Sequence, residues 1–171
     1  MTDIHPLPTR RRLNNKQGWI QTELKRFLAE RRPCLDGLPP TVAVVVTSIH
    51  DRLFETDLSA KTLRRDHAIG NNNFGTHFRN TVGLGMREYI ESLRLAAAGR
   101  LLRNPELEIY LVSMSVGYSH PETFCRAFQR VLGRTPMQER LVAGENGGLS
   151  RAENDTKSKA QEETSGQLSA N

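Results

Sequence analysis

The sequence predicts an all-helical protein, and three observations favour this fold class. Apolar residues recur at helical spacing along most of the chain, proline and glycine separate the segments, and helix-capping patterns precede several of them. A pair of phenylalanines followed by a glycine also occurs twice at the same internal spacing. We therefore expect consecutive helices that contain an internal repeat.

Residues 1–40 are expected to form a basic arm with one amphipathic helix. Residues 1–35 hold eight Lys or Arg against three Asp or Glu, including the run at 10–12. From about Lys16 to Arg32 an apolar stripe recurs at helical spacing, formed by Trp19, Ile20, Leu24, Phe27 and Leu28. We expect the stripe to fold onto the rest of the chain, with pairing to a second copy as the alternative. The basic residues fit either a solvated arm or an accessory contact to nucleic acid.

Residues 41–143 are predicted to form one domain of helices. The expected helices are Pro39 to Leu53, Leu58 to Asp66, Asn71 or Asn72 to Thr81, Gly85 to Arg103, and Glu108 to Ser115. The β-branched run at 42–46 could be a strand, but its 3.6-residue period continues to Leu53 and favours a helix. Capping boxes, in which two residues three apart bond each other's backbone amides, predict two more helix starts, at Ser119–Glu122 and Thr135–Gln138.

The repeat has the form of two helix-turn-helix units. The repeated pattern is Phe74, Phe78 and Gly83, then Phe124, Phe128 and Gly133. In each copy a short helix and a tight turn precede the helix that carries the phenylalanines. Unit one is expected at 58–83, the linker helix at 85–103 and unit two at 108–133. A linker of about twenty residues spans roughly 30 Å, close to the ~34 Å between successive major-groove openings on one face of DNA.

Unit two and the linker resemble a known family. The segment VGYSHPETFCRAFQRVLGRTP at 116–136 is similar to the signature of the AraC/XylS family of bacterial transcription regulators, and EYIESLRLAAAGRLL at 88–102 is similar to its linker helix. The resemblance implies a sequence-specific regulator that binds double-stranded DNA in the bacterial cytoplasm, nucleoid-associated when bound. It also implies an activator that contacts RNA polymerase at promoters. The chain departs from the family at Arg64 and His67, where small residues are common, and at Glu139, where a tyrosine is usual.

The resemblance and helical geometry together predict the side chains that contact DNA. Arg126 is the leading candidate for a base contact, because a guanidinium can bond O6 and N7 of guanine; its alternatives are a phosphate contact or a surface ion pair. Glu122 has an alternative role as a capping partner. Asparagines at a helix start often serve as caps, so unit one is expected to contribute less than unit two to the recognition of bases. The candidates are Asn71, Asn72, Asn73, Thr76, Arg79, Pro121, Glu122, Thr123, Cys125, Arg126, Gln129 and Arg130.

Composition and residue spacing argue against a metalloprotein, an enzyme or a membrane protein. The net charge of +5 permits a polyanionic partner. Neither the two cysteines nor the five histidines have metal-ligand spacing, and no nucleophile–base pair stands out, so we expect no metal, no cofactor and no enzymatic activity. No apolar run reaches the ~18 residues of a membrane span, so no membrane partner is expected.

Two alternatives remain open from the residues. A helical protein–protein interaction module with a degenerate helix-turn-helix fold is the second functional hypothesis, and the chain could be a monomer or a homodimer through its N-terminal helix. Residues 144–171 are rich in Gly, Ser and Glu and poor in apolar residues, which predicts a disordered tail.

Overall fold

A computed structural model describes residues 10–70 and 73–143, with side chains from residue 15 onward, and this part of the chain contains helices and no strands. The helices are α1 (Arg10–Glu30), α2 (Pro40–Asp51), α3 (Ala60–Asp66), α4 (Phe74–Val82), α5 (Met86–Leu102), α6 (Ile109–Ser115) and α7 (Pro121–Leu132). A further helix begins at residue 136 and reaches the end of the described range. The all-helical prediction is confirmed for these residues, and the predicted tail at 144–171 lies outside them.

The valine-rich segment is a helix. In α2 the buried residues are Val42, Val45, Val46, Ile49 and His50, which is the spacing of one helical face. The linker helix α5 has 17 residues, so it is about 26 Å long at ~1.5 Å per residue, a little shorter than predicted.

Two predicted helix starts are wrong. The helix α7 starts at Pro121, its N-cap is His120, and no side chain caps it, so the predicted capping box from Ser119 to Glu122 does not form. Proline is favoured at the first helical position, which starts the helix one residue later than that box requires. In α4 the N-cap is Asn73, without a side-chain cap bond, rather than Asn71 or Asn72, which lie outside the described residues.

Two capping boxes do form. The predicted one is confirmed, because the Thr135 amide donates to Gln138 Oε1 at 2.8 Å and the Gln138 amide donates to Thr135 Oγ1 at 3.2 Å. The other was not predicted: the Ser59 amide donates to Thr62 Oγ1 at 2.8 Å, and the Thr62 amide donates to Ser59 Oγ at 3.1 Å.

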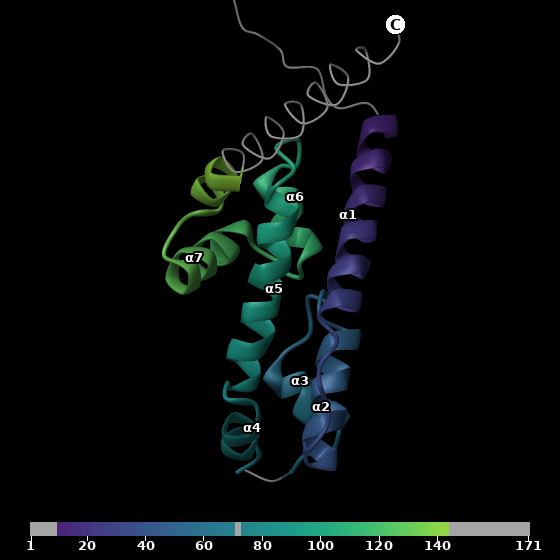
Figure 1. Ribbon diagram of the computed structural model, residues 1–171, viewed down its shortest axis with the longest axis vertical. Coiled ribbons are helices and arrows are strands. Elements are labelled where there is room, and N and C mark those ends of the chain that lie inside the picture. Colours follow the sequence, from purple (N-terminus) through teal and green to yellow (C-terminus); the bar gives the residue numbers. More distant parts are fainter. Residues whose placement is uncertain (1–9, 71–72, 144–171) are drawn as a thin grey trace, which may run out of the picture.

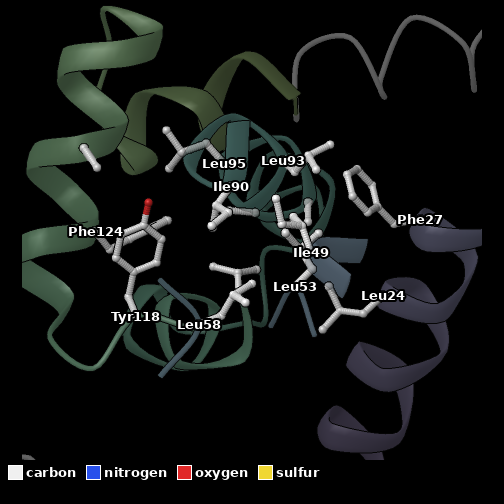
Figure 2. Close-up of a cluster of buried hydrophobic side chains, with 14 of the residues drawn as sticks. Leu24, Phe27, Ile49, Leu53, Leu58, Ile90, Leu93, Leu95, Tyr118 and Phe124 are labelled. Atoms are coloured by element: carbon white, nitrogen blue, oxygen red, sulfur yellow. The ribbon is translucent and has the colours of Figure 1, made fainter. Parts of the chain in front are cut away.

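The helix α5 is the centre of the fold. It contacts α1, α4, α6 and α7, and Figure 1 shows α1 on one side of it and α7 on the other. Figure 2 shows the buried core running from Leu24 and Phe27 of α1, past Ile90 of α5, to Phe124 of α7. All the predicted core anchors are buried: Phe74, Phe78, Leu93, Leu101, Val116, Tyr118, Phe124 and Phe128.

The N-terminal helix α1 packs onto the rest of the chain. Its stripe residues Ile20, Leu24 and Phe27 are buried in the shared core, whereas Trp19 remains 37% exposed. Polar contacts join the same two helices, because the Arg100 guanidinium bonds Glu30 at 2.7 and 3.0 Å and pairs with Glu23 at 3.3 Å. The apolar stripe of α1 is therefore buried within the chain, as expected if it folds onto the rest of the chain rather than pairing with a second copy.

The buried cation Arg94 joins the segment before unit one to the turn of unit two. Its side chain on α5 donates to the carbonyls of Leu53 at 2.8 Å and Glu55 at 2.5 Å, which precede α3, and of Gly117 at 3.0 Å, in the turn before α7. Gly117 has a φ of +88°, and a Cβ there would lie 2.9 Å from Arg94 Cζ. The turn must therefore be a glycine for the guanidinium to reach its carbonyl.

Replacing Arg94 should destabilise the fold strongly. The substitution Arg94→Met leaves three carbonyls without their donor, and we expect a loss of about 3 kcal/mol or more in the free energy of unfolding. Urea denaturation followed by circular dichroism measures this loss. The matched control is Arg103→Met at an exposed position of the same segment, expected to change stability by no more than about 0.5 kcal/mol. Equal stabilities for the two variants would contradict the role given to Arg94.

The α1 stripe should contribute to the stability of the whole chain. Truncating the buried Leu24 to alanine should lower the free energy of unfolding by about 2–5 kcal/mol, because it leaves a cavity against α5. The partly exposed Trp19→Ala serves as the comparison, and its smaller burial predicts a smaller loss. Chemical denaturation of both variants measures the difference, and a larger loss for Trp19→Ala would be inconsistent with the packing described.

Acid should destabilise the contact between α2 and α5. His50 Nε2 and Tyr89 Oη lie 2.9 Å apart, and burial lowers the pKa of His50 below its usual 6.5. As the pH falls, the unfolded chain binds this proton before the folded chain does. The contribution of neutral His50 is complete above about pH 6.5 and is lost as the pH falls through the folded-state pKa.

A variant without His50 should show a flatter dependence of the unfolding free energy on pH. Between about pH 7.5 and 5, His50→Gln should lose less unfolding free energy than the wild type, because it lacks this proton linkage. Thermal melts of His50→Gln and the wild type across this range measure the difference, and identical profiles for the two proteins would refute the linkage.

Candidate nucleic-acid interface

The helix α7 has a buried face and a polar face. Phe124, Ala127 and Phe128 are buried. Thr123, Arg126 and Gln129 recur at intervals of three on the opposite side and are exposed. Arg126 Nε donates to the carbonyl of Glu122 at 3.3 Å, so its guanidinium lies back along its own helix at the surface. The exposed side chains are those suited to bonding base edges or phosphates.

The second helix of unit one, α4, repeats this arrangement with fewer charges. Phe74 and Phe78 are buried, and Asn73, Thr76 and Asn80 are exposed. At the offset of the two repeats, Thr76 stands where α7 has Arg126, and Asn80 stands where α7 has Arg130. Both helices end alike, because Gly83 and Gly133 take left-handed conformations with φ of 86° and 71°.

Arginines on the two helices pair with one turn of α5. Arg79 of α4 bonds Glu88 at 2.9 Å, and Arg130 of α7 pairs with Glu91 at 2.5 Å. Both arginine side chains are more than half exposed, at 58% and 60%. An exposed ion pair such as Arg79–Glu88 contributes about 0–1 kcal/mol, so a phosphate could replace the Glu88 carboxylate at small cost, whereas only 17% of the Glu91 side chain is exposed.

Three other predicted contact residues of α7 are less suited to bind DNA. Pro121 and Cys125 are half-buried, and Cys125 packs against the core. Burial raises the pKa of the Cys125 thiol, and the nearby Glu122 carboxylate adds to the increase, so the thiol stays protonated. Glu122 is exposed in the first turn of α7, where its charge complements the helix dipole. Asn71 and Asn72 lie outside the described residues.

Three cations near the recognition helices were not singled out from the sequence. Lys61 of α3 and Arg87 of α5 are exposed, and Arg94 is buried beside them. Arg94 could have been found from its spacing, because it lies four residues after the buried Ile90 and four before the buried Ala98. No sequence signal distinguishes Lys61 and Arg87, because they come to line the same hollow only through the arrangement of α3 and α5 in the fold.

In the described part of the chain, no group of three or more His, Cys, Asp or Glu residues could hold a metal ion. None of the helices described there combines the length and hydrophobicity that a membrane span needs.

At Glu139 the sequence departs from the family that it resembles, and the carboxylate pairs with Arg134 at 2.5 Å.

Comparison with known proteins agrees with this arrangement. A family model described as a helix-turn-helix domain matches residues 65–141. An AraC-like transcription regulator of Streptomyces lividans is 32% identical over 97 residues, which cover 57% of this chain and 32% of that protein. The regulatory protein SoxS of Salmonella typhimurium is 38% identical over 63 residues, which cover 37% of this chain and 59% of that protein. The chain therefore spans less than two thirds of the length of either relative.

A solved structure shares the fold. The DNA-binding domain of AdpA, solved in complex with a target DNA, superposes with a TM-score of 0.55 at 24% identity, covering 61% of this chain and 93% of that domain. At this identity the likeness establishes the fold alone. Together these comparisons show that the present chain carries a helix-turn-helix domain similar to those of AraC-like transcription regulators.

Proposed function

We propose that the protein is a sequence-specific DNA-binding transcription regulator that inserts α4 and α7 into successive major-groove segments of double-stranded DNA. The observation that carries this proposal is the polar face of α7, opposite two buried phenylalanines, within a domain that matches a helix-turn-helix family model. A helix held by one face to a domain core can enter the ~12 Å wide major groove with the other.

The names of related proteins support a role in transcription. SoxS is a regulatory protein, a similar protein of Enterobacter is the transcriptional activator RhaR, and the AdpA domain was solved on its target DNA. The name of RhaR favours an activator. We propose in addition that the protein works at promoters with RNA polymerase in the bacterial cytoplasm. The names also favour a non-enzymatic function, since SoxS is named as a regulatory protein and RhaR as a transcriptional activator.

The two units are proposed to contribute unequally. The polar face of α7 carries Arg126, whereas the corresponding position of α4 is Thr76. Arginine makes the commonest specific contact to guanine, while threonine makes shorter and less selective contacts. Most of the sequence discrimination should therefore come from α7.

Selection from random duplexes followed by substitution tests the function and this division. An enriched motif is expected at moderate salt. On that site, Arg126→Ala should cost about 1–3 kcal/mol and relax specificity at one base pair. Arg130→Ala is the matched control within α7: it should weaken all sequences alike and lower the salt slope by about 0.9, as expected for a phosphate contact. Fluorescence anisotropy on the selected duplex and its single-base variants measures these effects.

Two results would count against the proposal. Selection without any enriched motif would reject sequence-specific binding and leave the protein–protein interaction module as the better hypothesis. Equal losses for Arg126→Ala and Thr76→Ala would instead reject only the unequal division between α7 and α4.

A further inference from the structure

A groove lies between the two helix-turn-helix units, beside α5. This central groove has a volume of about 460 Å³, and its lining includes Lys61, Arg87, Glu91, Arg94, His120 and Thr123. Thr123 belongs to the polar face of α7, so the groove opens beside the helix proposed to read DNA.

A second hollow connects this groove with the other recognition helix. It lies between α4 and α5, and its lining includes Thr76 and Arg79 of α4. Ala60 and Arg87 line both hollows, so the two form one concave surface that extends from Thr76 on α4 to Thr123 on α7. A duplex that touches both recognition helices must cross this surface.

The charges of the central groove leave two cations without a counter-ion. Arg94 is occupied by three carbonyls, and Glu91 is paired with Arg130. Among the residues that the structure describes, neither Lys61 nor Arg87 forms an ion pair, and both side chains are exposed. The groove therefore presents uncompensated positive charge midway between the helices α4 and α7.

We propose that Lys61 and Arg87 bind the sugar–phosphate backbone of the DNA where it crosses between the two major-groove segments. This inference rests on the proposed function, and it assigns a ligand to two residues outside both recognition helices. Cations that contact only phosphates fix the register of a protein on the duplex and do not read sequence. The pair would thus set where α4 and α7 enter the grooves.

The test measures how DNA binding depends on salt in variants that keep the size of the side chain. Lys61→Gln and Arg87→Gln should each reduce the slope of log K against log [salt] by about 0.9, and the double variant by about 1.8. Each should weaken binding roughly fivefold, both on the selected duplex and on a shuffled one, because the contact carries no sequence information.

Matched controls remove the same charges elsewhere. Lys25→Gln on α1 and Arg103→Gln after α5 are exposed and do not line either hollow, so their affinities and slopes should stay at the wild-type values. Thermal melts should show that all four single variants are as stable as the wild type, because the altered side chains lie at the surface.

Neutral backbone linkages then locate the contact. Methylphosphonates placed at the centre of the selected site, between the two half-sites, should weaken the wild type but cause little further loss in the double variant. Equal losses in both proteins, or an unchanged salt slope in the double variant, would overturn the phosphate contact while leaving the proposed function intact. A wild-type protein that selects no DNA sequence would overturn both.

Discussion

One buried guanidinium holds both the segment that precedes unit one and the turn of unit two. Arg94 extends from the central helix α5 and donates to carbonyls of the segment before α3 and to the carbonyl of Gly117 before α7. A guanidinium can do this because its five donors lie in one plane and point in several directions, whereas an ammonium or an apolar side chain of the same length could not satisfy all three carbonyls. The ring of Tyr118 lies under the same cation, 5.9 Å away from its centre.

The buried anchors of the recognition helices α4 and α7 leave the exposed faces of these helices free to be polar. Phenylalanines anchor α4 and α7 in the core, so the helices do not need their surface ion pairs for stability. Arg79 instead holds the Glu88 carboxylate of α5 in a contact that solvent screens. Exchanging this carboxylate for a DNA phosphate would alter the partner of the arginine without disturbing the core.

The N-terminal helix α1 completes the other side of α5. It supplies Ile20, Leu24 and Phe27 to the same core and is held by Arg100 through Glu23 and Glu30. Its basic residues are therefore carried on the side of α5 away from α7, as seen in Figure 1. Contacts between α1 and the duplex are accordingly less favoured than those of Lys61 and Arg87, which lie between the recognition helices.

The sequence by itself determined the helices, the repeat and most of the core, because apolar spacing and the two Phe–Phe–Gly patterns are local properties of the chain. It also indicated the polar face of α7, since helical geometry places Thr123, Arg126 and Gln129 together once Phe124 and Phe128 are buried. Local patterns failed at the start of α7, where the proline at 121 competes with a capping box.

Only the tertiary structure decided that Arg94 is buried, that Arg79 and Arg130 face carboxylates of α5, and that Lys61 and Arg87 share one concave surface. Each of these depends on contacts between residues distant in sequence, and side-chain periodicity within a single helix carries no information about which residues of another helix lie opposite.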